Sequence, residues 1–213
     1  MKVTFAKDQL VKAASITQSM VNPQTSLPVL ANILIEAEGE RVVFVTTDLE
    51  ASVRCIVQAK VAEPGRTTVP ARTFADLVRE LPEGEVTLEI EGNLVKVHSE
   101  DNSYHLQTMP AEDFPSWPEI KPLSTLSIEQ AQLAGMLGRV LFAVPQRDPR
   151  KVLLGALFDV KDGALIAVAT DGKKLGYCRR ELSEVVGDRE TSAIVPHKIL
   201  IEVQRALMAE GEV

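Results

Sequence analysis

Apolar and polar residues alternate along the first half of the chain in two successive patterns of the same kind. Residues 6–21 place apolar side chains every three or four positions, which predicts an amphipathic helix. In residues 85–91, Val86, Leu88 and Ile90 are separated by polar residues, which predicts a strand buried on one face. The complete pattern predicts the order βαβββ twice, with helices at 6–21 and 71–81 and strands at 3–5, 29–38, 41–47, 51–61, 67–69, 85–91, 94–99 and 103–109.

The second part of the chain repeats the first at an offset of 123 residues. Segment 43–48 recurs as 166–171, and Cys55 recurs as Cys178. Ser127 and Gln130 have the spacing of a capping box, which predicts a helix beginning near residue 128. The elements expected here are helices at 128–144 and 197–208 and strands at 152–160, 164–170, 174–182 and 191–195. By the repeat, three further strands would complete this second unit.

A proline-rich segment separates the two parts. Four prolines lie within residues 110–122 and disfavour both helix and central strand, so we interpret the segment as an inter-domain connector. Phe114 and Trp117 within it are interpreted as anchors against the domains rather than as a ligand site. The expected domains are 1–120 and 121–213, and the second lacks its last three strands.

Composition is that of an ordinary soluble globular protein, with 45% hydrophobic and 25% charged residues. No apolar run reaches the ~20 residues that a membrane span needs. The N-terminus has no apolar signal core, and the two cysteines are far apart, which argues against a disulfide scaffold or a cysteine-rich zinc site. We therefore expect a cytoplasmic protein.

The net charge of −7 argues against a generic nucleic-acid-binding protein, since such proteins are usually basic. The charges are unevenly distributed, however. The stretches 6–21, 71–81, 128–151 and 197–209, which are mainly helical by prediction, hold ten basic and six acidic residues, whereas the remainder holds 13 basic and 24 acidic residues. Two interpretations stand: an ordinary charged helix face, or a basic surface that meets phosphate groups without reading bases.

Catalytic chemistry is not indicated. The chain has no G-x-S-x-G, no phosphate-binding P-loop, no G-x-G-x-x-G and no H-E-x-x-H. His98, His105 and His197 lack metal-ligand spacing, and the carboxylates of the alternating strands are interpreted as solubilising. We expect no catalytic residues, no metal site and no cofactor.

Five segments, taken in their order and spacing, resemble the bacterial DNA polymerase III β subunit family, the sliding clamps. These segments are Ser26–Leu30, Thr47–Glu50, Thr68–Arg72, Pro110–Pro115 and Ala169–Gly172. The resemblance implies an α+β DNA-clamp fold of repeated βαβββ units, with helices on an inner face and antiparallel sheets on the outer face. It also implies a non-catalytic processivity clamp, in which two three-domain subunits form a ring around duplex DNA.

The resemblance implies partners of several kinds. They are double-stranded DNA bound without sequence preference, the catalytic subunit of DNA polymerase III, the clamp loader, and other polymerases and repair factors that dock through a short hydrophobic peptide motif. A full-length chain is expected to form a homodimer, and no membrane partner is expected. The third domain is absent from this sequence, so an alternative stands: a truncated or two-domain clamp-like protein that docks peptides without encircling DNA.

Two sets of site residues follow from the resemblance. The expected DNA-facing residues are Gln24, Arg72, Arg147, Arg150, Lys151 and Lys198. The expected half of a partner-peptide cleft consists of Leu153, Thr170, Gly172, Lys173, Lys174 and Leu175. Their alternative interpretations are a solvated helix start for Arg72 and Lys198, and plain core for the two leucines.

Overall fold

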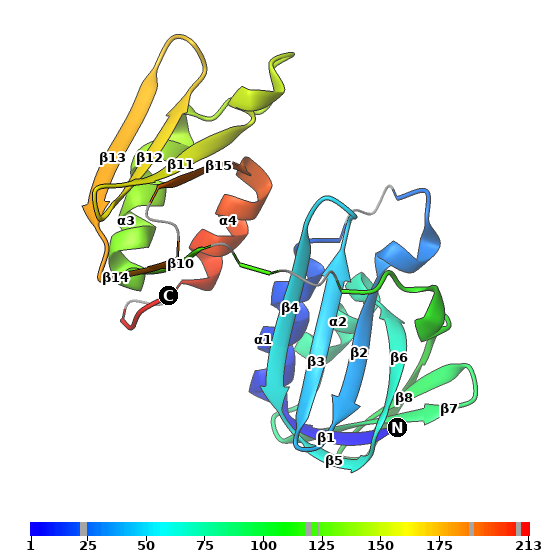
Figure 1. Ribbon diagram of the computed structural model, residues 1–213. Coiled ribbons are helices and arrows are strands. Elements are labelled where there is room, and N and C mark those ends of the chain that lie inside the picture. The colour runs from blue at the N-terminus through cyan, green and yellow to red at the C-terminus, as the bar shows by residue number, and fades with distance from the viewer. Residues whose placement is uncertain (22–24, 118–120, 123, 188–189, 208–209) are drawn as a thin grey trace. The chain divides into compact units, whose positions relative to one another are not determined.

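The computed structural model describes residues 1–21, 25–117, 121–122, 124–187, 190–207 and 210–213. The chain divides into two compact units, unit 1 (Met1–Trp117) and unit 2 (Pro118–Val213) (Figure 1). Gln24, one of the expected DNA-facing residues, lies outside the described residues. Within the described residues, no helix is long and apolar enough to cross a membrane.

Unit 1 contains the predicted elements with some boundaries shifted. Its helices are α1 (Lys7–Gln18) and α2 (Ala71–Glu80), and a 3-10 turn, η1 (Pro28–Ala31), replaces the first residues of a predicted strand. Its strands are β1 (Lys2–Ala6), β2 (Asn32–Glu38), β3 (Arg41–Thr47), β4 (Ser52–Gln58), β5 (Lys60–Glu63), β6 (Gly65–Pro70), β7 (Glu85–Glu91), β8 (Leu94–Ser99) and β9 (Asn102–Gln107).

The strands of unit 1 form two antiparallel sheets, in the orders β5-β1-β7-β8-β9 and β4-β3-β2-β6. The two βαβββ halves exchange strands, because β1 pairs with β7 and β2 pairs with β6. The strand predicted at 51–61 is two strands in different sheets, and the chain leaves the first at Ala59, whose N–H donates to the Glu40 carbonyl (3.1 Å). Each sheet therefore depends on both halves of the unit.

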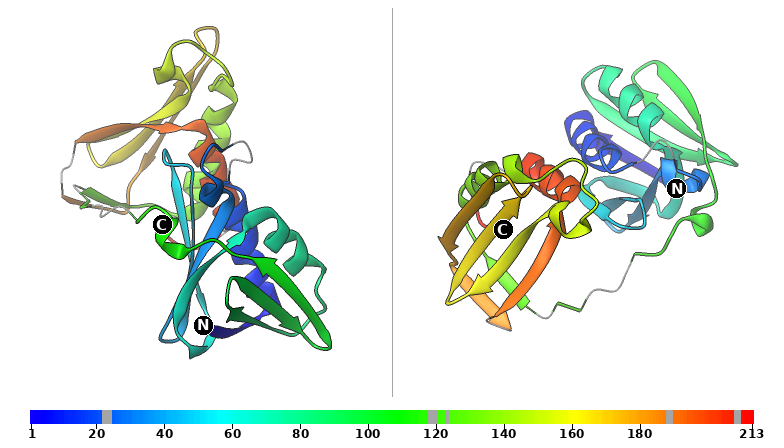
Figure 2. Two further views of the ribbon diagram at one scale, coloured as in Figure 1. Left: turned by 90° about the vertical axis from the view of Figure 1, so that its right-hand side faces the viewer. Right: turned by 90° about the horizontal axis from the view of Figure 1, so that it is seen from above.

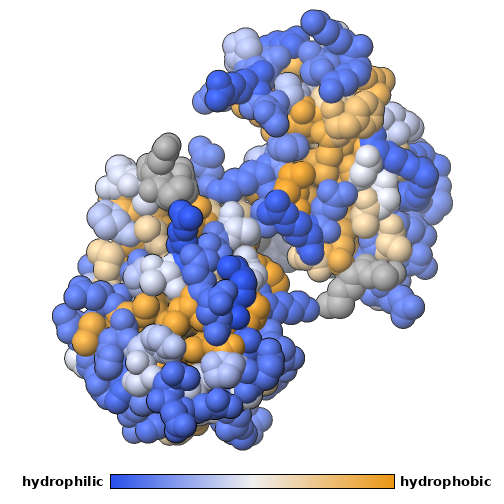
Figure 3. Space-filling model, turned by 180° about the vertical axis from the view of Figure 1, so that it is seen from behind, coloured by the Kyte–Doolittle hydropathy of each residue, from blue (hydrophilic) through white to orange (hydrophobic). Residues whose placement is uncertain are grey.

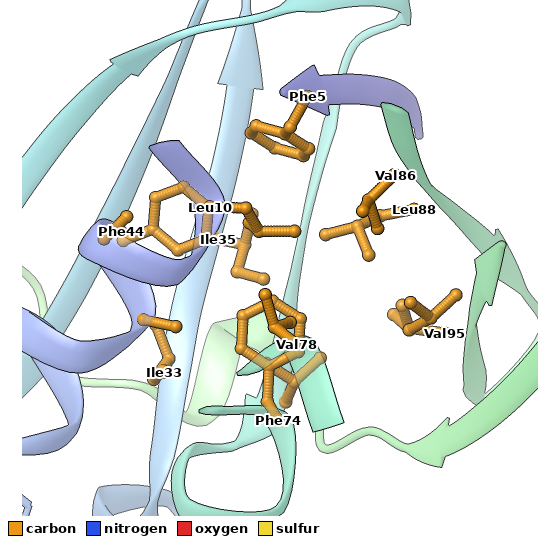
Figure 4. Close-up of a cluster of buried hydrophobic side chains, with 14 of the residues drawn as sticks. Phe5, Leu10, Ile33, Ile35, Phe44, Phe74, Val78, Val86, Leu88 and Val95 are labelled. Carbon is orange, nitrogen blue, oxygen red and sulfur yellow. The ribbon is translucent and has the colours of Figure 1, made fainter. Parts of the chain in front are cut away.

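One hydrophobic cluster joins these sheets to the helices. Phe5 of β1, Phe44 of β3 and Phe74 of α2 are almost fully buried in it, and Figure 4 shows their rings among aliphatic side chains from both sheets. The Phe5 and Phe44 rings lie 5.8 Å apart between centroids in a tilted arrangement, which aromatic pairs favour. Burial of this apolar surface holds α1 and α2 against both sheets.

Helix α1 ends three residues before the predicted boundary. The Met20 N–H donates to the Thr17 carbonyl (3.3 Å), so the last turn is closed by a shorter i to i+3 bond. The hydroxyl of Thr46, from β3, donates to that carbonyl (2.9 Å). A tertiary contact thus satisfies the carbonyl at the point where the helix stops.

Unit 2 repeats this architecture in part. Its helices are α3 (Gln130–Val140) and α4 (His197–Ala206), with 3-10 turns η3 (Leu141–Ala143) and η4 (Lys151–Leu153). Its strands are β10 (Ser124–Ser127), β11 (Gly155–Lys161), β12 (Ala164–Thr170), β13 (Leu175–Glu181), β14 (Glu184–Gly187) and β15 (Thr191–Pro196). Strands β10 and β14, which the sequence pattern did not predict, pair with each other.

The larger sheet of unit 2 has the order β13-β12-β11-β15. Side chains of α3 and α4 share one hydrophobic cluster with β11 and β12, and Figure 2 shows both helices on the same side of this sheet. The pairing of Leu157 with Val168 reproduces that of Leu34 with Val45 in unit 1. The offset of 123 residues therefore relates three-dimensional positions as well as sequence.

The start of α3 differs from the expected capping box. The residue before the helix is Glu129, and no side chain caps the helix N-terminus. The Ser127 hydroxyl instead hydrogen-bonds to Glu212 (2.9 Å). Ile128 and Val213 exchange two backbone hydrogen bonds of 3.0 Å, where Phe5 pairs with Val86 in unit 1.

Candidate functional site

The loop between β12 and β13 contains most of the predicted cleft residues. The Thr170 hydroxyl donates to the Lys174 carbonyl (2.7 Å) and accepts from the Gly172 N–H (3.0 Å). Asp171 accepts from the N–H groups of Lys173 and Lys174, both at 2.9 Å. These backbone bonds, with the nearby Lys174 ammonium, lower the pKa of Asp171. Gly172 has a φ of +88°, which glycine adopts without steric cost.

The counterpart loop in unit 1 is built in the same way. Thr47 donates to the Ala51 carbonyl (2.9 Å), and Asp48 accepts from the Ala51 N–H (2.8 Å). Leu49 stands where unit 2 has Gly172, and its φ is +73°. The Thr-Asp pair therefore defines the turn in both units, and it does so with either leucine or glycine at the third position.

Arg150, which lies between η3 and η4, contacts the loop between β12 and β13. Its Nε and Nη2 donate to the two carboxylate oxygens of Asp148, each at 2.9 Å. Nη2 also approaches the Asp171 carbonyl at 3.5 Å, and a β-carbon added to Gly172 would lie 3.4 Å from Nη2. The Arg150 hydrogen bonds lower the pKa of Asp148 to about 2. We call this arrangement the Asp148–Arg150 bracket.

Apolar side chains lie beside the loop. Leu175 is 63% exposed, whereas Leu153 is half-buried in η4 and donates its N–H to the Arg150 carbonyl (3.0 Å). Phe142, which is 56% exposed, lies with its ring centroid 5.7 Å from the Lys174 ammonium. Sequence reasoning missed Phe142, because it stands in the apolar run 140–144, where nothing distinguishes an exposed residue from a buried one.

The outer face of the β11–β12 sheet is more open than its counterpart in unit 1. There, Val29, Leu34 and Val45 are buried in a cluster with Ala111 and Phe114 of the connector. Their counterparts in unit 2 include Val152, which is 62% exposed, and Leu157, which is 36% exposed. The expectation that Phe114 is an anchor is confirmed, and Trp117 is partly exposed. Figure 3, seen from behind the view of Figure 1, shows apolar surface among hydrophilic side chains on the opposite side of the units.

The predicted DNA-facing residues lie on three elements. Arg147 and Arg150 lie between η3 and η4, Lys151 is the first residue of η4, and all three are exposed. Arg72 lies in the first turn of α2, with its side chain 85% exposed and its Nε 3.9 Å from Asp76. Lys198 is exposed in the first turn of α4, the equivalent helix of unit 2. Helix starts and one loop thus present these cations.

One cavity of unit 1 lies away from the predicted site residues. Its volume is about 940 Å³, and Lys7, Lys60 and Glu85 are among its lining residues. Lys60 and Glu85 form an ion pair of 2.6 Å there. Within the described residues, no group of three or more His, Cys, Asp or Glu side chains is placed to hold a metal ion.

Both units match known protein families. Residues 1–118 match the N-terminal domain of the DNA polymerase III beta subunit, and residues 127–213 match its central domain. A beta sliding clamp from Chlamydia pneumoniae is 35% identical over 215 residues, which is 100% of this chain and 58% of that protein.

Solved structures agree with these matches. The DNA polymerase III subunit beta of Pseudomonas aeruginosa superposes with a TM-score of 0.90 at 34% identity, and the sliding clamp of Bacillus subtilis superposes with a TM-score of 0.93 at 26% identity. Each comparison covers 100% of this chain and 58% of the other. The α+β clamp fold is confirmed, and the chain spans somewhat more than half the length of these relatives. It belongs to the DNA polymerase III beta subunit family, the sliding clamps.

Proposed function

We propose that this chain forms part of a processivity clamp that encircles duplex DNA and tethers the replicative DNA polymerase. The observation that carries this proposal is the match of its two parts, in order, to the N-terminal and central domains of one clamp subunit. Residues 1–120 and 121–213 are then the first and second clamp domains. The protein acts in the cytoplasm as a non-catalytic accessory subunit, because a ring holds its polymerase by topology and needs no bond chemistry.

The DNA contacts are made to phosphates. Arg72, Arg147, Lys151 and Lys198 are exposed cations on helix starts and on one loop. Phosphate contacts position a protein without reading sequence, and water-mediated contacts of modest strength leave a ring free to slide. The acidic charge of the whole chain is compatible with this role, because only the surface that meets DNA has to be basic.

The peptide contacts are made beside the β12–β13 loop. Leu153 and Leu175 supply apolar surface, and Gly172 lets the backbone of the loop turn close to a bound peptide. Lys173 and Lys174 add positive charge for an acidic peptide. A Helicobacter pylori beta clamp, which shares this fold with a TM-score of 0.88 at 21% identity, was crystallised with a DNA ligase peptide. Polymerase III, the clamp loader and repair factors are the proposed partners at this surface, and two subunits form the ring.

A second candidate is a peptide-docking scaffold that does not encircle DNA. It is favoured by one observation: the Thr170–Leu175 loop is fully formed within unit 2. The two functions differ in how DNA ends affect binding, since a ring escapes only over an open end.

The deciding experiment measures retention on nicked circular plasmid. The protein is incubated with the clamp loader and ATP, and the DNA-bound fraction is separated by gel filtration before and after the plasmid is cut once. Release on cutting supports encirclement. Equal retention on circular and linear DNA, or none on either, contradicts it and favours the scaffold.

A further inference from the structure

We propose that a hollow on the outer face of the unit 1 sheet binds a peptide segment of a partner protein, one that places a carboxylate beside an apolar side chain. The hollow has a volume of about 360 Å³. The charged side chains that line it are Glu36, Glu38, Arg41, Arg54 and Arg66. It belongs to unit 1, whereas the Thr170–Leu175 loop belongs to unit 2, so the inference goes beyond the proposed function.

The strand register places these arginines on the outer face of the sheet β4-β3-β2-β6. Arg54 is directly opposite Val45, and Arg66 is directly opposite Glu36. Val45 belongs to the cluster that packs against the connector, whereas α1 and α2 pack against the other face of the sheet (Figure 1). The hollow therefore lies beside the connector, on the opposite side of the sheet from α2, which carries Arg72.

Two of the three arginines have acidic neighbours. Arg66 forms an ion pair with Glu112 (2.8 Å), and Arg41 is directly opposite Glu38 in the sheet. Arg54 is exposed and, within the described part of the chain, forms no ion pair with a carboxylate. A guanidinium can donate two parallel hydrogen bonds to one carboxylate, so Arg54 is the cation of this hollow that is available to an acidic ligand.

Apolar side chains beside Arg54 favour a peptide over a free anion. The Cζ atom of Arg54 lies 6.0 Å from the centroid of the Trp117 ring, and Trp117 is 40% exposed. Ile56, two residues further along β4 and so on the same face, is 52% exposed. Tryptophan and arginine are enriched among the residues that contribute most to protein–protein binding. The two glutamates of the hollow also disfavour a polyanion such as DNA, whose phosphates they repel.

Unit 2 shows that the sheet itself does not require these arginines. The equivalent positions of unit 2, defined by the same strand pairing, hold no arginine; they are Ala164, Tyr177 and Ser192. The sheet β13-β12-β11-β15 nevertheless has the same arrangement of strands as β4-β3-β2-β6. Formation of the sheet therefore does not account for the arginines of unit 1, whereas binding of a ligand of opposite charge does.

The first test follows the fluorescence of Trp117, the single tryptophan, in the intact 213-residue chain. The probe is the synthetic peptide acetyl-Leu-Asp-Leu-amide, and acetyl-Leu-Asn-Leu-amide is the matched control that lacks only the charge. We expect a saturable change with the aspartate peptide and binding about fivefold or more weaker for the asparagine peptide, because its neutral amide makes weaker hydrogen bonds to a guanidinium. Equal binding of the two peptides, or no saturable change with either, would overturn the proposal.

The second test removes the guanidinium. Arg54→Gln changes an exposed side chain, so the protein should fold as wild type does, and the aspartate peptide should bind about fivefold or more weakly. Arg179→Gln is the matched control, because Arg179 is an exposed arginine on β13, the equivalent strand of unit 2, and pairs there with Glu181 at 2.6 Å. It should bind the peptide as wild type does. Wild-type affinity in Arg54→Gln, or the same loss in both variants, would show that the hollow is not the site.

Two further measurements exclude other positions and other ligands. Leu175→Ala, which changes the peptide surface proposed in unit 2, should leave the Trp117 response to the aspartate peptide unchanged; loss of the response would assign the peptide to that surface and contradict this inference. A short DNA duplex and inorganic phosphate are then added as competitors. We expect neither to displace the peptide, and displacement by either would assign the hollow to phosphate groups instead of a protein carboxylate.

Discussion

The hydroxyl of Thr68 both accepts from the N–H of Met109 (3.0 Å) and donates to its carbonyl (2.9 Å). This pair ties the connector to β6 just before the connector crosses the outer face of the unit 1 sheet. Asn32 donates to the same hydroxyl at 2.9 Å, so the group has its full complement of partners. The connector is therefore fixed at its start by hydrogen bonds and further along by burial of Phe114.

Replacing that hydroxyl should destabilise unit 1. Thr68→Val keeps the shape but leaves the backbone groups of Met109 and the Asn32 amide without this partner, so we expect a loss of about 1–3 kcal/mol in the free energy of unfolding. Urea unfolding followed by Trp117 fluorescence is the measurement, since Trp117 is the single tryptophan and lies in the same connector. Thr73→Val on the exposed face of α2 is the control, with an expected change within about 0.5 kcal/mol. Equal midpoints for the two variants would contradict this account.

Replacing either of two glycines of unit 2 with alanine should change the stability of the protein, in opposite directions for the two positions. Gly172→Ala forces a β-carbon into a φ of +88° and is expected to cost about 1–2 kcal/mol. Gly135→Ala lies within α3 with open space around the new carbon, so helix propensity should raise stability by about 0.5–1 kcal/mol. Thermal unfolding by circular dichroism distinguishes the two. A Gly172→Ala variant as stable as wild type would show that the turn does not require this conformation.

The ion pair of the Asp148–Arg150 bracket should persist in mild acid. The folded pKa of Asp148 lies near 2, below its ordinary value of 3.8. The ionised carboxylate therefore contributes to the stability of the folded state above the ordinary pKa, and this contribution is lost as pH falls through the folded pKa. We expect the carboxyl carbon of Asp148 to titrate with a midpoint near pH 2 by NMR. In Arg150→Lys the midpoint should move toward 3.8, because the fork that favours the carboxylate is gone. The same midpoint in both proteins would refute this assignment of the pKa shift.

Removal of two cations that we propose to face DNA should affect DNA binding and leave the fold intact. Arg72→Ala with Lys198→Ala removes exposed side chains from two helix starts, so the unfolding midpoint should stay within about 0.5 kcal/mol of wild type. Loading onto nicked plasmid should fall. The slope of log binding against log salt should become shallower by about 2, one for each phosphate that the variant no longer neutralises.

Arg79→Ala with Arg205→Ala is the matched control for charge, since both residues lie in the last turns of the same helices. Both arginines also pair with acidic residues of their own helix, Arg79 with Asp76 at 3.1 Å and Arg205 with Glu202 at 2.8 Å. If the two double variants weaken loading equally, net charge rather than the positions of Arg72 and Lys198 explains the effect.

Local patterns in the sequence predicted most of the elements but not how they pair. The alternation of Val86 and Leu88 is a property of adjacent residues, so strand β7 was predicted correctly. Its pairing with β1 joins residues 79 to 87 positions apart, and the periodicity of a sequence carries no information on such distant contacts. The split at Ala59 was missed for the same reason, because a distant carbonyl, that of Glu40, defines it.

The candidate site was predicted in part. The cleft residues of the Thr170–Leu175 loop were proposed from the resemblance to the clamp family, and the structure shows that Thr170 and Asp171 close this loop with local hydrogen bonds. Arg150 was assigned to the DNA-facing set by the same resemblance, and no sequence rule shows that its guanidinium is engaged by Asp148. Ser127 was expected to cap α3, but a contact with Glu212 takes its hydroxyl. In each case a contact outside the local pattern determined the side chain's direction.

Because unit 2 repeats part of unit 1, a surface of one unit has a counterpart in the other. The connector covers one such surface, that of the unit 1 sheet. Because Phe114 and Ala111 occupy the face around Leu34 and Val45, a protein that recognised the open counterpart around Leu157 would find it in unit 2 and not, among the described residues, at the equivalent position of unit 1. Partners that bind this one surface would compete with one another, and their relative abundance and affinity would decide which of them is bound.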